Sequence, residues 1–212
     1  MIPLSIVGHE SEINGVPGKE HYYLLKFLSC HLDNDKPAQG YFRTSQAQSP
    51  VMIDIGTHVG MSAWALGSNP HTELHTWDII DRILESKKTF TQNIKFHLED
   101  LWDEETWDIN KDLILNSKLV FQDTDPHNGH MEYQIYQRLK EAKYTGYMLF
   151  DDIHYFADMR QNFWQRIPEE HKLDITYAGH WSGCGLVCFH PEKLAQLGKD
   201  IKEWWELNWR NK

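Results

Sequence analysis

The sequence is poor in cysteine and in long apolar runs, and each shortage excludes a class of protein. Three cysteines among 212 residues are too few for a disulfide framework, so we expect a reducing, cytoplasmic location. Cys184 and Cys188 fall in one expected strand, roughly 13 Å apart, which is too far for a disulfide bond. No run of about 18 apolar residues occurs, so we expect no membrane-spanning helix.

Basic residues are also scarce relative to acidic ones. Lys and Arg total 21 against 31 Asp and Glu, which gives a formal net charge of −10. Proteins that bind nucleic-acid backbones or anionic membranes need clustered Lys and Arg. We therefore expect neither partner, and a small neutral or cationic ligand or a metal ion suits this charge better. The sequence leaves the oligomeric state open.

Short apolar stretches alternate with amphipathic ones along the chain, which predicts alternating strands and helices. The expected strands cover residues 51–55, 74–77, 94–98, 119–121, 147–150, 173–177 and 186–189. The expected helices cover residues 18–32, 59–66, 80–90, 129–142, 156–167 and a segment that starts at Pro191. The last two strands are too close in sequence for a crossover helix, so we expect them to be antiparallel.

This order predicts an α/β fold of the Rossmann-like, doubly wound kind. The sheet would be seven-stranded and mostly parallel, with an antiparallel last strand. We expect one domain over residues 1–212. Within it, residues 1–49 would form a short helical N-terminal cap, 50–190 a cofactor-binding core and 191–212 a C-terminal helix.

Every expected strand in the parallel part ends in a carboxylate. Ligands bind beyond the carboxyl ends of parallel strands, so these acids mark one candidate site. They are Asp54, Asp78, Glu99, Asp100, Asp123, Asp125, Asp151 and Asp152. A single aspartate at a strand end commonly caps a turn or a helix. Acids at successive strand ends in register indicate binding instead.

The first strand end carries a turn with the sequence Asp-Ile-Gly-Thr-His-Val-Gly over residues 54–60. Gly56 and Gly60 would let a ligand approach the backbone. The turn lacks the middle glycine of the dinucleotide fingerprint, which disfavours a dinucleotide-dependent oxidoreductase. Asp54 suits a cationic amino-acid group, and Asp78 suits two ribose hydroxyls.

Residues 54–62 resemble motif I of the class I S-adenosylmethionine-dependent methyltransferases, particularly the metal-dependent O-methyltransferases of the macrocin and catechol types. The likeness runs from about Val51 to Phe189 and implies S-adenosylmethionine as cofactor. It implies that Asp78 binds the ribose and that Asp100 lies by the adenine. The implied cofactor-binding residues are Asp54, Gly56, Thr57, Gly60, Ser62, Asp78 and Asp100.

Asp123, Asp151 and Asp152 follow the fourth and fifth expected strands and predict a metal site. Neighbouring strand ends lie about 5 Å apart, and clustered carboxylates repel one another unless a cation binds. Oxygen ligands favour Mg²⁺, Mn²⁺ or Ca²⁺ over Zn²⁺. The resemblance to macrocin-type sugar O-methyltransferases implies the same three magnesium ligands, with Asp125 as general base. His127 is the alternative base.

These features predict a divalent-metal-dependent (Mg²⁺ or Mn²⁺) O-methyltransferase that acts on a small hydroxylated acceptor. Asp152 favours a sugar or glycoside, because catechol-type relatives carry asparagine there. His154 and Trp181 lie on loops at the expected mouth of the site and are candidates for contacting the acceptor. Two alternatives remain: a catechol-like phenol as acceptor, and an accessory domain that binds S-adenosylmethionine without transferring its methyl group.

Overall fold

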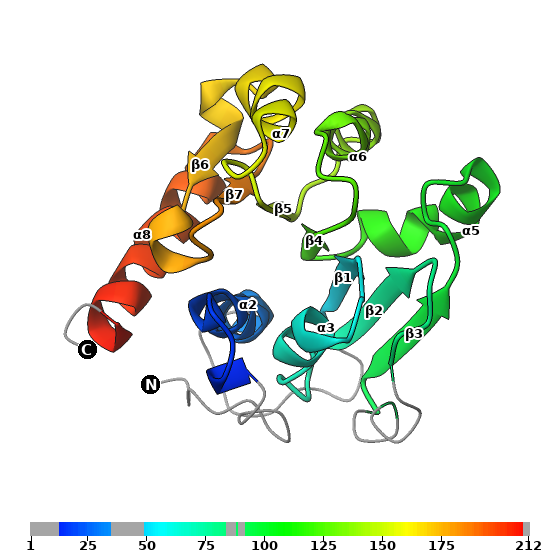
Figure 1. Cartoon of the computed structure of the whole chain (residues 1–212), viewed down its shortest axis with the longest axis horizontal. Coiled ribbons are helices and arrows are strands. Elements are labelled where there is room, and N and C mark those ends of the chain that lie inside the picture. The colour runs from blue at the N-terminus through cyan, green and yellow to red at the C-terminus, as the bar shows by residue number, and fades with distance from the viewer. Residues whose placement is uncertain (1–12, 35–48, 84–87, 89–91, 210–212) are drawn as a thin grey trace.

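The computed structural model describes residues 13–34, 49–83, 88 and 92–209. Its centre is one seven-stranded sheet in the order β3-β2-β1-β4-β5-β7-β6 (Figure 1). The strands are β1 Val51–Ile55, β2 Glu73–Asp78, β3 Ile94–Leu98, β4 Leu119–Gln122, β5 Tyr147–Asp151, β6 Lys172–Asp174 and β7 Cys184–Val187. Strands β1 to β5 pair in parallel, and β7 runs antiparallel to both β5 and β6. The predicted fold class is therefore confirmed.

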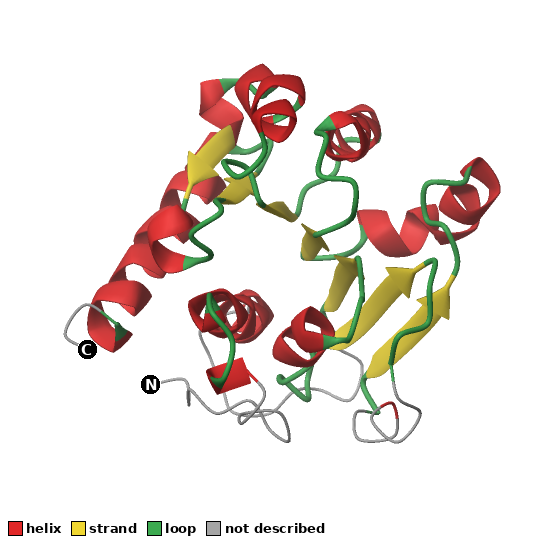
Figure 2. Cartoon of the chain, in the orientation of Figure 1, coloured by secondary structure: helices red, strands yellow, loops and turns green. Residues whose placement is uncertain are grey.

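Helices lie on both faces of this sheet (Figure 2). They are α2 Lys19–His31, α3 Met61–Leu66, α5 Glu104–Leu115, α6 His130–Glu141, α7 Ala157–Asn162 and α8 Pro191–Asn208. Short 3₁₀ turns are η1 Leu32–Asn34, η2 Trp164–Arg166, η3 Glu169–His171 and η4 Thr176–Ala178. None of the described helices is long and apolar enough to span a lipid bilayer.

Each face of the sheet has its own core, because successive side chains of a strand point to opposite faces. In β1, Met52 packs into the cluster formed with α2, α3 and α8. Ile53 and Ile55 pack into the other cluster, with residues of α5, α6 and α7. Burial on both faces explains why the strands read as continuous apolar runs.

The sequence pattern did not predict α5. In α5 only Trp107 and Ile114 are buried, so the helix has almost no apolar stripe. Its signal is Asp103, whose side chain accepts hydrogen bonds from the backbone N–H groups of Glu105 and Thr106. The helix expected over 80–90 falls largely outside the described residues, and residues 80–83 form a loop.

The late strands are antiparallel as predicted but begin and end earlier than expected. Strand β6 ends at Asp174 because the following residues turn into η4. The three cysteines are free, as predicted. Helix α2 belongs to the predicted N-terminal cap, and its His21 ring lies 5.2 Å from the ring of Phe121 in β4. The cap thus brings side chains of α2 to the strand ends.

Candidate cofactor and metal site

The turn after β1 has a geometry that only glycine allows. Gly56 has a φ of 104°, and a Cβ added there would lie 1.8 Å from the carbonyl oxygen of Asp123. The N–H groups of Gly56 and Thr57 donate to the carbonyl of Trp77, at 2.9 and 3.1 Å. Gly60, with a φ of 89°, starts α3. The turn is therefore held tightly against both neighbouring strands.

Asp54 lies fully buried beneath this turn. Its Oδ2 accepts hydrogen bonds from Ser62 Oγ at 3.1 Å and Thr76 Oγ1 at 2.7 Å, and its Oδ1 has no partner among the described residues. Burial raises the pKa of Asp54 to about 7, against the opposing effect of these two hydrogen bonds. Asp54 lines neither of the two cavities described next, so its place in the structure is that of a brace under the turn.

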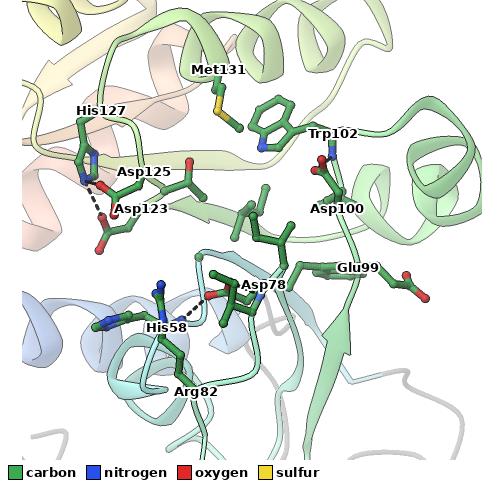
Figure 3. A pocket seen from close by; sticks show the side chains of 17 residues that line it. His58, Asp78, Arg82, Glu99, Asp100, Trp102, Asp123, Asp125, His127 and Met131 are labelled. Carbon is green, nitrogen blue, oxygen red and sulfur yellow. Dashed lines mark hydrogen bonds and ion pairs between the residues drawn. The ribbon is translucent and has the colours of Figure 1, made fainter.

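A cavity of about 340 Å³ opens beyond β1, β2 and β4. Figure 3 shows Asp123, Asp125 and His127 on one side of it, and Glu99, Asp100 and Trp102 on the other. Gly56 and Asp78 also line it. The structure therefore brings Gly56, Asp78 and Asp100 together around one space.

Backbone groups hold the two outer carboxylates of this cavity in place. Asp78 accepts hydrogen bonds from the N–H of His58 at 2.7 Å and of Ile80 at 2.9 Å. Asp100 accepts one from the N–H of Trp102 at 2.8 Å. Each carboxylate oxygen has further lone pairs, so both acids can still accept hydrogen bonds from a ligand.

A second cavity, of about 350 Å³, lies between the start of α2 and the strand ends. Thr57 and Ser62 line it, whereas Gly60 lines neither cavity. Its acidic wall consists of Asp123, Asp151 and Asp152. The two cavities share Gly56, His58 and Asp123, so they lie side by side across the glycine turn, and we call the two together the groove.

The three predicted metal ligands meet on this groove and bring two histidines with them. Asp123 and Asp152 form a group with His127, and Asp151 and Asp152 form a second group with His180. Within each group the candidate ligand atoms lie within 4.8 Å of one another. Carboxylates and imidazoles at such spacing can hold a divalent ion.

Desolvation and mutual repulsion shift the pKa values of two acids of the cluster. Desolvation and then the charge of Asp151 raise the pKa of Asp123 to about 6. Desolvation and then the charge of Asp152 raise the pKa of Asp151 to about 7. Burial alone would raise the pKa of Asp152 too, but His180 and Ser182 hold it below its ordinary value. Burial and the neighbouring carboxylates therefore both disfavour the charged forms of Asp123 and Asp151.

The two candidate bases differ sharply in orientation. The Asp125 side chain is 93% exposed, whereas that of His127 is 13% exposed. His127 Nε2 lies 3.4 Å from Asp152 Oδ2, 3.6 Å from Asp125 Oδ1 and 3.8 Å from Asp123 Oδ1. Its ring stacks on Phe156, with 5.5 Å between centroids. The structure thus directs His127 toward the candidate metal-binding acids.

The two candidate acceptor residues occupy different surroundings. His154 Nε2 lies 2.6 Å from Asp174 Oδ2, and the residue lines neither cavity. Trp181 is 65% exposed and packs edge-on against Tyr155, with 5.2 Å between ring centroids. It follows His180 directly and therefore lies beside the acidic cluster.

His21, Tyr22 and His180 line the second cavity and were not singled out from the sequence. His21 is 4% exposed, and burial lowers its pKa to about 4. Neither of its ring nitrogens has a hydrogen-bond partner in the described part of the chain. No sequence signal identifies His21 or Tyr22, because they reach the site only through the packing of α2. His180 stands next to the glycine-rich turn before β7, which is a weak signal for a site loop.

No known protein-family model matches the chain, and no curated protein matches it. Similar solved structures include the MycE methyltransferase of the mycinamycin biosynthetic pathway, in complex with Mg, SAH and mycinamycin VI. It is 16% identical with a TM-score of 0.47, over 77% of this chain and 52% of that one. This chain thus spans about half the length of MycE.

Two further solved structures are similar to this chain. A Klebsiella pneumoniae protein, provisionally named as an O-methyltransferase, is 15% identical with a TM-score of 0.42, over 87% of this chain and 96% of that one. Fibrillarin of Aeropyrum pernix, with bound S-adenosyl-L-methionine, is 14% identical with a TM-score of 0.40, over 68% and 63%.

Proposed function

We propose that this chain is an S-adenosylmethionine-dependent O-methyltransferase that uses a divalent metal ion and methylates a hydroxyl of a small acceptor, with a sugar or glycoside favoured. The observation that supports this most strongly is the groove in which the Asp78–Asp100 cavity meets the carboxylate cluster. Asp123 lines both halves of that groove. A cofactor in one half would thus lie next to an acceptor in the other.

The first cavity supplies suitable contacts for the cofactor. Asp78, fixed by two backbone N–H groups, would accept hydrogen bonds from the ribose hydroxyls. Asp100 and Trp102, which lie across the cavity from Asp123, would flank the adenine. The absence of a side chain on Gly56 leaves the backbone open to the ligand. Asp54 and Ser62 would act indirectly, by bracing the turn.

The acidic cluster suits a hard divalent ion such as Mg²⁺ or Mn²⁺. Asp123, Asp151 and Asp152 would hold it, and its positive charge would offset the burial and mutual repulsion that raise the pKa values of Asp123 and Asp151. When bound, such an ion supplies Lewis-acid polarisation of the acceptor hydroxyl. His127 Nε2, held between the acids by stacking on Phe156, would accept the hydroxyl proton.

The preference for a sugar rests on Asp152 and on the aromatic residues beside the cluster. Tyr155 and Trp181 are 55% and 65% exposed and touch each other edge to face. Exposed aromatic faces next to a metal site can hold the apolar face of a sugar ring or a phenol. An acceptor panel separates these cases, since turnover of vicinal phenols but not of glycosides would refute the sugar preference.

Calorimetry with S-adenosylhomocysteine, with Mg²⁺ or with EDTA, tests the proposal. We expect binding to the wild type and at least about tenfold weaker binding to Asp78→Asn, because a hydrogen bond to a charged group contributes about 1.5–3 kcal/mol. Asp108→Asn, on the exposed face of α5, is the matched control. No binding by the wild type would refute the proposal. Binding without methyl transfer to any acceptor would identify the accessory domain instead.

A further inference from the structure

We propose that Asp151, Asp152 and His180 form a second cation subsite, which binds a divalent transition-metal ion beside the metal position of the proposed function. The inference rests on that function in one respect, because Asp151 and Asp152 would each be shared between the two positions. The occupants would be neighbouring ions that face the same groove.

The orientation of Asp152 is the first support. Its Oδ2 lies 3.4 Å from His127 Nε2, on the side of Asp123. Its Oδ1 lies 3.9 Å from His180 Nδ1, and the same nitrogen lies 3.9 Å from Asp151 Oδ2. A carboxylate whose two oxygens face separate ligand groups is arranged to bridge two ions, which in two-metal sites lie about 3.5–4 Å apart.

The backbone around this subsite is unusual and firmly held. Asp152 has a φ of 59°, which non-glycine residues rarely adopt. The N–H groups of Ile153 and His154 donate to the carbonyls of Gly183 and Ser182, at 3.3 and 2.9 Å. A Cβ at Gly183 would lie 2.7 Å from the His154 nitrogen, so this close approach requires glycine. These contacts place the His180 loop over the acids.

Unpartnered buried atoms are the second, independent support. The Asp151 side chain is 10% exposed, and its Oδ1 has no hydrogen-bond partner among the residues that the structure describes. Within the same part of the chain, His21, which is 4% exposed and lines the same cavity, has no partner for either ring nitrogen. Buried polar atoms in proteins are almost always satisfied, so a ligand or its coordinated water is expected between them.

The donor set determines the class of ion. Two carboxylate oxygens and one imidazole nitrogen make a mixed oxygen and nitrogen site, and the Ser182 hydroxyl contacts the same His180 nitrogen. Imidazole suits Fe²⁺, Ni²⁺ or Zn²⁺ better than Mg²⁺ or Ca²⁺, and the two carboxylates also accept Mn²⁺. The neighbouring group of Asp123, His127 and Asp152 offers the same kinds of donor atom, so Mn²⁺ alone can fill both positions.

Titration with Mn²⁺ alone, followed by calorimetry and electron paramagnetic resonance, tests the subsite. We expect two Mn²⁺ ions per chain and a spin-coupled signal from the wild type. His180→Ala should bind one ion and lose the coupled signal, whereas His190→Ala should keep two. His190 is the control because it also lies near a carboxylate, 3.8 Å from Glu192, away from the groove.

A single equivalent of uncoupled Mn²⁺ in the wild type would overturn the inference, and that measurement needs no variant. Two ions in a folded His180→Ala protein would overturn it equally, with circular dichroism as the check on folding. Failure of the proposed function looks different. In that case the wild type would bind two Mn²⁺ ions but would not bind S-adenosylhomocysteine.

Discussion

Replacing Gly56 by alanine should damage stability and the groove together. A Cβ at Gly56 would lie 1.8 Å from the Asp123 carbonyl oxygen, whereas ordinary contact begins at 3.4 Å. The strand end must therefore retreat by 1.6 Å, the difference between these distances. That movement breaks the hydrogen bond from the Asp123 N–H to the Ile55 carbonyl, which is 2.9 Å long.

The cost of Gly56→Ala follows from these contacts. The positive φ of 104° adds about 1–2 kcal/mol for a residue with a side chain, and the lost hydrogen bond about 0.5–1.5 kcal/mol. Some overlap between the added Cβ and the Asp123 carbonyl would remain. In total, we expect a loss of about 2–4 kcal/mol from the free energy of unfolding. A misplacement of about 1 Å at a reacting group can cost about 100-fold in rate. Under the proposed function, we therefore expect the Mg²⁺ affinity and the rate of methyl transfer to fall in Gly56→Ala as well.

Urea denaturation and calorimetry with Mg²⁺ measure the two effects of Gly56→Ala. Gly198→Ala is the control, because a Cβ there meets only the flexible end of the Leu173 side chain. It should change the free energy of unfolding by less than about 1 kcal/mol. A Gly56→Ala protein as stable as this control, with wild-type metal affinity, would refute the reasoning.

Three further predictions concern Asp54, the proposed base and the proposed metal ligands. The raised pKa of Asp54, about 7 against 3.8 unfolded, makes its contribution to stability complete below pH 3.8 and lost as pH rises toward 7. The free energy of unfolding should thus fall by up to about 4 kcal/mol over this pH range. Denaturation at pH 4 and pH 8 measures the fall, and Asp54→Asn should abolish it; a fall as large as in the wild type would contradict this. His127→Asn should lower kcat about 10²–10⁴-fold, and Asp125→Asn should lower it less. A larger loss of kcat in Asp125→Asn than in His127→Asn would identify Asp125 as the base instead. Mg²⁺ affinity should rise between pH 5 and 8 as Asp123 and Asp151, with pKa values of about 6 and 7, ionise; a flat calorimetric profile would argue against these ligands.

Local patterns predicted much of the fold because strands buried on both faces need continuous apolar runs. The segment from Val51 to Ile55 shows such a run and forms the central strand β1. Helix α5 escaped prediction because it buries little, and capping by Asp103 is a weaker signal than an apolar stripe. The late strands shifted by a few residues because a 3₁₀ turn, which carries no clear sequence signal, shortens β6.

The sequence by itself determined the sheet, the glycine turn and the gathering of acids at one edge. Those features depend on neighbours along the chain and on the common direction of parallel strands. Tertiary structure alone decided that Asp54 is buried, that His127 faces the acids and Asp125 faces solvent, and that His21 and His180 join them. Such choices depend on backbone direction and on packing between segments far apart in sequence, which no local pattern records.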